Sequence, residues 1–145
     1  DYLKKGKQVY NIHNFLRTPM FKGAGAIYAT AKDLLKWDQA LYDHTLLSKK
    51  LTNKMLTSST SQKNYGYGWG IAEVPRLGKV FAHIGGAFDL RSLVVRIPKS
   101  KTLIVILSNT GLPFENIWAD IAEQVYKSIS KDYVPLNLEE RLSLE

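Results

Sequence analysis

The sequence FAHIGGAFDLRS, residues 81–92, stands between two apolar runs that are typical of β-strands. It places one imidazole, His83, at the expected end of the first strand, with two adjacent glycines shortly after it. Adjacent glycines let the backbone bend sharply, or let a ligand approach the main chain closely. The pattern therefore indicates a strand end that lines one side of a site.

Apolar residues around this stretch recur with the period of two that is typical of β-strands. The pattern predicts an antiparallel sheet of about four strands, over residues 67–74, 79–83, 91–97 and 102–108. Turn-forming residues separate neighbouring strands at positions 75–78 and 98–101. The last strand holds an unbroken apolar run, residues 103–107, so we expect it to be central and covered on both faces.

Helical periodicity predicts two helices before the sheet and one after it, over residues 31–43, 49–56 and 114–130. Thr30 is a favourable N-cap for the first helix, and Asp33 completes an Asp variant of the capping box. Residues 1–22 show little periodicity and are interpreted as a loop with one short strand near residues 8–12. The order of elements predicts an α+β fold with the last helix packed on one face of the sheet.

The length of 145 residues fits a single domain, which we place at residues 1–143. Residues 144–145 are interpreted as a vector scar and are excluded from the functional argument. No apolar run is long enough for an integral membrane segment. The absence of cysteine excludes disulfides and a thiol nucleophile.

The formal net charge of +7 would favour binding to polyanions. The basic residues are dispersed along the sequence, however, so we prefer a solvated basic surface over a nucleic-acid site. The three histidines, His13, His44 and His83, are far apart and lack ligand spacing. We therefore expect no metal site and no cofactor.

A serine nucleophile is not evident from the motifs. No serine lies in a G-x-S-x-G elbow. Residues 128–131, SISK, satisfy S-x-x-K, but a pattern with two fixed positions arises often by chance. We interpret that match as a coincidence, because it lies far in sequence from the glycine pair.

Four stretches, in order, resemble the serine β-lactamase-like hydrolases, which include class C β-lactamases, penicillin-binding DD-peptidases and related esterases. Residues 23–37, GAGAIYATAKDLLKW, resemble the family stretch aGGlySTaaDLarf, and residues 65–70, YGYGWG, resemble its YGyGW strand. Residues 83–92 resemble HtGGtpGfsS without gaps, and residues 103–109 resemble the vvvLsN strand. Each motif alone is weak, but their order over residues 23–130 makes the resemblance specific.

The resemblance implies a half-site. In this family the Ser of an S-x-x-K motif forms an acyl-enzyme, and a second motif, Y-x-N or S-x-N, also precedes the present region. The third motif, K-T-G or H-[ST]-G, corresponds to residues 83–85. The implied catalytic residues are His83, Gly85 and Gly86, with the Gly86 N–H as an oxyanion-hole donor. Ile84 and Ala87 would line the substrate.

The chain is accordingly interpreted as the C-terminal part of a bacterial serine hydrolase with a partial β-lactamase/transpeptidase-like fold. The complete protein would hydrolyse a β-lactam, peptide or ester substrate, and would be extracytoplasmic, either periplasmic or on the cell surface. This chain alone is expected to be inactive, because the first two motifs are missing.

Three departures from the family pattern keep an alternative open. Ile84 replaces the usual Ser or Thr, Phe88 the usual Pro, and Asp89 the usual Gly. A substrate-binding hydroxyl is therefore absent. The alternative is a non-catalytic module that binds a ligand or peptidoglycan.

The family also completes its sheet with strands from the N-terminal end of the chain, beside the last strand. Without them, the apolar run at residues 103–107 would have an open edge, and such edges recruit other chains. We therefore expect a homo-oligomer through this edge, or residues 1–15 folded back as a substitute strand.

Overall fold

The computed structural model describes residues 2–5, 8–11, 23, 25, 27–59, 63–87, 90–109 and 117–130. Its helices are α2 (Ala31–Tyr42), α3 (Lys49–Met55) and α4 (Trp118–Ile129), with a 3-10 turn η2 (Pro98–Ser100). Its strands are β1 (Tyr2–Lys5), β2 (Gln8–Asn11), β3 (Gly70–Val74), β4 (Gly78–Ala87), β5 (Leu90–Ile97) and β6 (Thr102–Ser108). None of these helices is long and apolar enough to cross a membrane.

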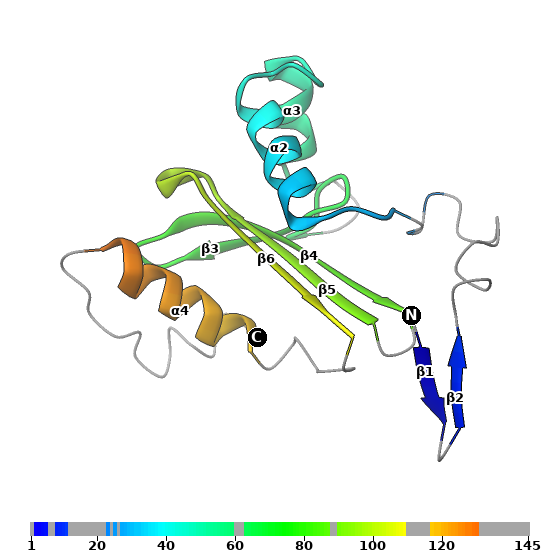
Figure 1. Cartoon of the computed structure of the whole chain (residues 1–145). Helices are drawn as coiled ribbons and strands as arrows, with labels where there is room; N and C mark the ends of the chain where they lie inside the picture. The colour runs from blue at the N-terminus through cyan, green and yellow to red at the C-terminus, as the bar shows by residue number, and fades with distance from the viewer. Residues whose placement is uncertain are drawn as a thin grey trace.

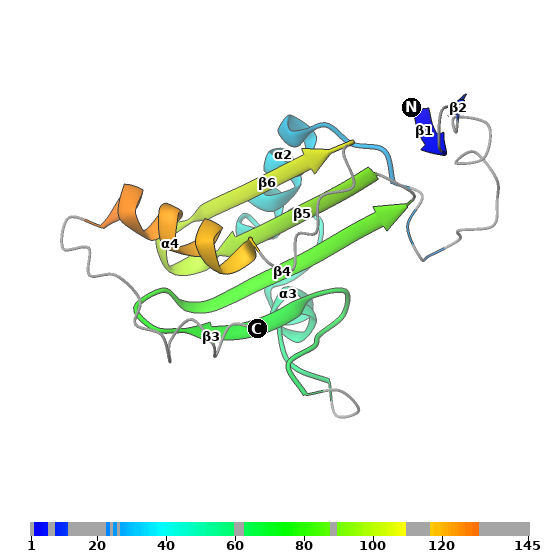
Figure 2. The same cartoon turned by 90° about the horizontal axis from the view of Figure 1, so that it is seen from below.

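The four strands β3 to β6 form one antiparallel sheet in sequence order, which confirms the predicted α+β fold (Figure 1). The sheet has a helix layer on each face: α4 lies along one face, and α2 and α3 lie on the other (Figure 2). The predicted bounds of the two N-terminal helices agree with the structure to within one residue. Of the helix predicted over residues 114–130, positions 114–116 lie outside the described residues.

β3 begins later than the sequence pattern indicates. The prediction started this strand at residue 67, but Tyr67 donates its N–H to the carbonyl of Met55 at 3.2 Å, and Gly68 turns the chain with φ +81°. Glycine adopts positive φ without a steric penalty, so the aromatic–glycine alternation encodes a turn here and not a strand. Pairing with β4 starts at Gly70.

β4 is longer than predicted, and this changes the interpretation of the glycine pair. The strand was expected to end at His83, but it continues to Ala87 and pairs with β5 throughout. Gly85 lies opposite Ser92, and a Cβ at Gly85 would overlap the Ser92 Oγ. The glycines therefore lie within an extended strand and not in a bend, and Gly85 leaves room for the Ser92 side chain.

β6 is not the central strand that its apolar run predicts. It lies at the end of the strand order and pairs only with β5 within the described part of the chain. Leu107 is half exposed. β1 and β2 pair with each other in a separate two-stranded sheet, so the described residues 2–5 and 8–11 of the expected substitute strand do not join the main sheet; the rest of residues 1–15 lies outside the described part.

The main core lies between the sheet and α4. Alternate residues of the strands point to this face and, with Leu77 of the β3–β4 turn, are fully or almost fully buried: Val74, Val80, Leu93, Val95 and Ile97. Ile117, Ile121, Val125 and Tyr126 cover them from the α4 side. The helical period of α4 therefore matches the period of two in the strands to form one apolar layer.

A buried ion pair fastens α2 to the opposite face. Arg96 of β5 donates from Nε to Asp38 Oδ1 of α2 at 2.5 Å, and both side chains are at most 4% exposed. The Arg96 guanidinium also lies 3.9 Å from the centroid of the Tyr42 ring. Trp37 of α2 stacks on Trp69, with ring centroids 5.6 Å apart. This face is thus joined by polar and aromatic contacts.

The predicted capping box at the start of α2 is present. The Asp33 N–H bonds to Thr30 Oγ1, and the Asp33 carboxylate accepts from both the Thr30 hydroxyl, at 2.7 Å, and the Thr30 N–H. These bonds lower the pKa of Asp33 in the folded chain, the side-chain bond having the larger effect. The helix start is therefore sensitive to the protonation of a single carboxyl.

This contact predicts a loss of stability in acid. Because the folded state holds Asp33 with a lowered pKa, its contribution is present above the unfolded pKa of about 4 and is lost as the pH falls through the folded value. Urea unfolding measured as a function of pH should show this slope. Asp33→Asn should reduce the slope; an unchanged slope in that variant would contradict the assignment.

Candidate active site

Among the described residues, one edge of β4 is unpaired where the predicted site residues lie. β3 pairs with β4 only from Gly78 to Ala82, whereas β5 pairs with β4 from Phe81 to Ala87. Within the part of the chain that the structure describes, residues 83–87 thus have a strand on one side only. An open strand edge exposes main-chain donors and acceptors to a ligand.

The register shows which residues direct their main-chain groups to this edge. Ile71 of β3 donates its N–H to the carbonyl of Asn64 at 2.8 Å, so its main chain points away from β4. Its partner Phe81 must then bond to β5, because the N–H and C=O of one residue in an antiparallel strand point to the same side. The alternation continues along β4. Ile84 and Gly86 therefore direct N–H and C=O to the open edge.

His83 lies on the same face of the sheet as α2. Phe81 lies opposite Arg96, whose side chain contacts α2, so Phe81 is on the α2 face. Side chains alternate between faces along a strand, so His83, two residues later, is on the same face. The imidazole is exposed, and its ring centroid is 6.5 Å from that of Tyr65 at an interplanar angle of 57°. His83 is thus a solvent-accessible titratable group beside the open edge.

Ile84 and Gly86 alternate to the opposite face. The Ile84 side chain is 50% exposed. Gly86 is exposed, and the Arg91 side chain lies beside it, since a Cβ at Gly86 would lie 3.5 Å from Arg91 Nη1. Arg91 is held by a bond from Nη1 to the carbonyl of Leu90 at 2.9 Å. A positive charge is therefore fixed beside the Gly86 peptide.

The sequence-predicted site residues come together in one segment. His83, Ile84, Gly85, Gly86 and Ala87 are consecutive in β4, and the last of them is half buried. The departures from the family pattern at positions 88 and 89 lie outside the described residues.

Sequence reasoning missed three neighbours of this segment: Tyr65, Arg91 and Ser92. A hairpin centred on positions 88–89 places Arg91 opposite Gly86 and Ser92 opposite Gly85. The antiparallel pattern was therefore sufficient to predict two of the three. The contact between Tyr65 and His83 needs the path of the loop before β3, which the sequence does not show.

The S-x-x-K match at residues 128–131 lies elsewhere. Ser128 is exposed near the C-terminal end of α4, and its Oγ donates to the carbonyl of Val125 at 2.8 Å. That end of α4 lies by the β3–β4 and β5–β6 turns, away from the open edge of β4 (Figure 2). Lys131 lies outside the described residues. Ser128 is therefore not placed to act on a ligand beside Gly86.

Comparisons with known proteins identify the family of this chain. The sequence profile of the Beta-lactamase family matches residues 2–126. Penicillin-binding protein 4* of Bacillus subtilis (strain 168) is 26% identical over 92 residues, which is 61% of this chain and 20% of that protein. A second protein of that organism named for penicillin binding, PbpX, is 48% identical over 88 residues, 60% of this chain and 21% of that protein.

A solved structure shares the fold. The crystal structure of a penicillin binding protein from Bacillus halodurans matches 66% of this chain and 30% of its own, with a TM-score of 0.56 and 25% identity. The chain spans about a fifth of the length of the two curated relatives. The family profile nevertheless covers most of the chain, including β3 to β6 and most of α4. This chain belongs to the Beta-lactamase family.

Proposed function

We propose that this chain is part of a longer serine hydrolase and that β4 forms one side of its acyl-transfer site. The observation that carries the proposal is the direction of the Gly86 N–H toward the open edge of β4. A carbonyl seated along this edge would meet a preorganised donor. Donors of this kind stabilise the charge that develops on the carbonyl oxygen in acyl transfer.

The roles of the other residues follow from their places on the strand. A serine hydroxyl from elsewhere in the complete protein attacks the carbonyl of an amide, ester or β-lactam, and water later releases the acyl group. Gly86 donates to the oxyanion, together with the N–H of that serine. His83 presents a polar or cationic group on the α2 face, while Ile84 and Ala87 line the substrate. Gly85 leaves room for the Ser92 side chain of β5.

Arg91 adds a fixed electrostatic contribution. Its guanidinium lies against Gly86, on the face opposite to His83. A cation beside an oxyanion donor favours negative charge at that point, whether on the tetrahedral intermediate or on a substrate carboxylate. The proposed substrates are therefore small acyl compounds or peptides, and family membership supports an extracytoplasmic location for the complete protein.

The first test compares the chain with the complete protein. We expect no turnover of nitrocefin or of p-nitrophenyl esters by residues 1–145, because one oxyanion donor without a nucleophile does not complete an acyl-transfer site. The complete protein should be acylated by a fluorescent penicillin and should retain the label after denaturation. Turnover by the isolated chain that Gly86→Pro abolishes would refute the assignment of the nucleophile to another segment.

A non-catalytic binding module is the second candidate, and Ile84 is the observation that favours it. A half-exposed apolar side chain stands where the family has a hydroxyl. Such a site would hold an extended peptide along the β4 edge without reacting with it. The complete protein would then bind peptidoglycan fragments saturably without covalent labelling by penicillin. Labelling together with turnover would exclude this candidate.

We further propose that the chain self-associates through β6. Main-chain groups alternate between the two sides of β6, as they do along β4. Leu103, Val105 and Leu107 therefore direct their N–H and C=O groups away from β5, toward the open side of the sheet. This edge is seven residues long and carries no charged side chain. Long, uncharged open edges recruit other strands.

Sedimentation equilibrium of the isolated chain tests this proposal. We expect a dimer that Val105→Pro converts to a monomer, because proline removes an outward N–H without breaking a bond to β5. Val105→Thr keeps that N–H and should remain dimeric. A wild-type chain that is monomeric across the concentration range would contradict the proposal.

A further inference from the structure

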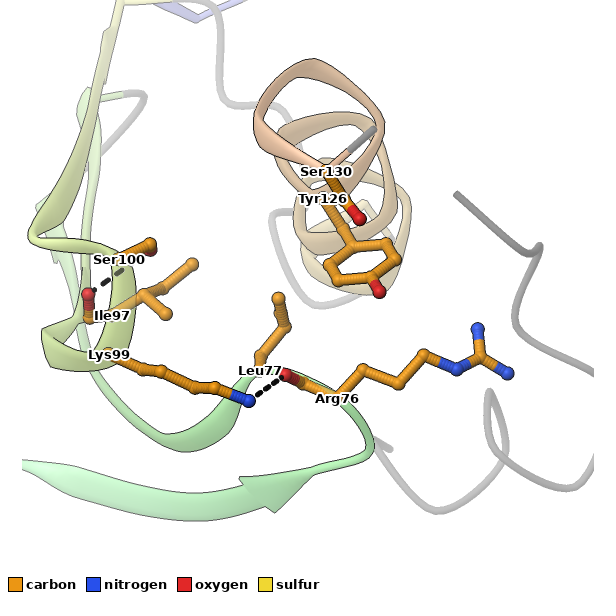
Figure 3. Close-up of a pocket in the computed structure, with 7 residues that line it drawn as sticks. All are labelled: Arg76, Leu77, Ile97, Lys99, Ser100, Tyr126 and Ser130. Atoms are coloured by element: carbon orange, nitrogen blue, oxygen red, sulfur yellow. Dashed lines mark hydrogen bonds between the residues drawn. The ribbon is translucent and has the colours of Figure 1, made fainter. Parts of the chain in front are cut away.

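A small pocket lies at the end of the sheet opposite to the open edge of β4. It has a volume of about 270 Å³ and lies between the β3–β4 turn, the β5–β6 turn and the C-terminal end of α4 (Figure 3). Leu77 and Ile97 form an apolar floor, and Arg76 and Lys99 supply positive charge. Tyr126 and Ser130 add hydroxyls from α4. The pocket therefore combines charge, hydroxyl groups and a small apolar surface.

The two cationic residues belong to turns that are tied together. Lys99 donates from Nζ to the carbonyl of Arg76 at 2.9 Å, which joins η2 to the β3–β4 turn (Figure 3). An ammonium has three N–H donors, so this bond leaves others for a ligand. Arg76 has φ +67°, a conformation that glycine adopts more readily. The turn thus carries a long cationic side chain at a position where the backbone conformation would suit glycine better.

Further charges from the same two turns have the same sign. Lys101 follows Lys99, with φ +51°, and Lys79 follows Arg76 at the start of β4. The acidic residue described in β3 and β4 is Glu73, which lies opposite Lys79 in the register of these two strands. The side chains that line the pocket include both cations but not this carboxylate. The charged residues among the described ones that line the pocket are therefore both cationic, which suits an anion.

We propose that this pocket binds a phosphate group that carries a small organic substituent. Lys99 would contact the phosphate oxygens, and the hydroxyls of Tyr126 and Ser130 would donate to them; Arg76, which extends away from Lys99 in Figure 3, would turn its side chain toward the same group. The apolar floor of Leu77 and Ile97 would accommodate the substituent. Charged donors and phosphate oxygens form the strongest class of hydrogen bond in proteins.

The pocket is too distant from Gly86 to take part in acyl transfer. β4 has ten residues and runs from the β3–β4 turn to the open edge, which separates the two places by about 25–30 Å at about 3.3 Å per residue. A phosphate ligand here would therefore hold the protein on a phosphate-bearing molecule while the β4 edge stays accessible. The ligand is either a soluble phosphate ester or the headgroup of an anionic phospholipid.

Titration of the isotope-labelled chain with glycerol 3-phosphate, followed by amide NMR shifts, tests the proposal. We expect saturable shifts confined to residues 76–78, 98–101 and the end of α4, with weaker binding of inorganic phosphate. Lys99→Met should weaken the affinity about tenfold, because a hydrogen bond to a charged group is lost. Arg76→Met should weaken it similarly, and Lys99→Arg should restore most of it.

The matched control is Lys36→Met, which removes an exposed cation from α2 on the other face of the sheet. It should leave the affinity unchanged. Equal weakening by Lys36→Met, or shifts that stay linear with phosphate concentration, would overturn the proposal in favour of a diffuse charge effect. Melting temperatures of the variants separate loss of binding from loss of folding.

Vesicles distinguish the two sources of phosphate. Sedimentation with phosphatidylglycerol vesicles but not with phosphatidylcholine vesicles, lost in Lys99→Met, assigns the ligand to a lipid headgroup. Saturable binding of glycerol 3-phosphate without vesicle binding assigns it to a soluble ester. Absence of both would refute the site. None of these readouts depends on acyl transfer, so their failure and that of the proposed activity are independent.

Discussion

Replacing Gly86 by proline in the complete protein is expected to lower kcat by about 10²–10³, the usual effect of deleting one oxyanion-hole donor. The N–H of Gly86 points to the open edge of β4, so its removal breaks no bond to β5. Proline is tolerated at strand positions of this kind. Steady-state kinetics on a chromogenic ester or β-lactam would measure the change, with the loss mainly in kcat.

Gly86→Ala is the matched control, because it changes the side chain and keeps the N–H. Gly86 has an extended backbone, and a Cβ there would lie 3.5 Å or more from the nearest Arg91 atoms, an ordinary contact. Alanine should therefore retain most of the activity. Equal losses in the alanine and proline variants would show that crowding, and not the missing donor, accounts for the effect.

The largest expected effect on stability comes from Asp38→Ala. This change leaves the Arg96 guanidinium buried without its carboxylate, and breaking a buried pair in this way costs about 3–5 kcal/mol. Urea unfolding of the 145-residue chain, followed by tryptophan fluorescence, should show a large fall in the midpoint. The stacked pair Trp37 and Trp69 provides a local probe of α2 docking.

Two further variants distinguish loss of the ion pair from general disruption of α2. Asp38→Leu combined with Arg96→Met removes both charges and should recover most of the stability. Tyr42→Phe removes a hydroxyl that has no hydrogen-bond partner in the described part of the chain, and should be neutral or slightly stabilising. If Asp38→Ala unfolds at the wild-type midpoint, the pair is not a stabilising contact.

The fold could largely be predicted from the sequence because its elements have regular periods. The strand over residues 102–108, the N-cap at Thr30 and the helix near residues 118–129 each follow from local patterns that the packed structure preserves. The family resemblance added the position of the site, and the profile match over residues 2–126 confirms the family. The individual site residues remain a prediction.

The predictions that were wrong share a physical cause: each depends on which segments, distant in the sequence, pair in the fold. An apolar run is compatible with a central strand or with an edge, and only the strand order places residues 103–107 at the edge. The glycine pair is compatible with a bend or with an extended strand, and only the pairing of β4 with β5 decides for the latter. The cations of the two turns are 23 positions apart in sequence, which is why the charge looked dispersed.

The buried contact between α2 and β5 has a consequence for the chemistry at β4. Arg96 faces α2, whereas its neighbours Val95 and Ile97 are fully buried in the α4 layer. A slip of β5 by one residue would exchange these faces. The guanidinium would then lie among apolar side chains, and a valine would lie against Asp38. Such a slip would also move Arg91 from its place opposite Gly86 and turn its side chain to the other face of the sheet. A charge pair on one face of the sheet thus keeps a second arginine beside the main-chain donor on the other face, and helix docking and the position of Arg91 are expected to be lost together.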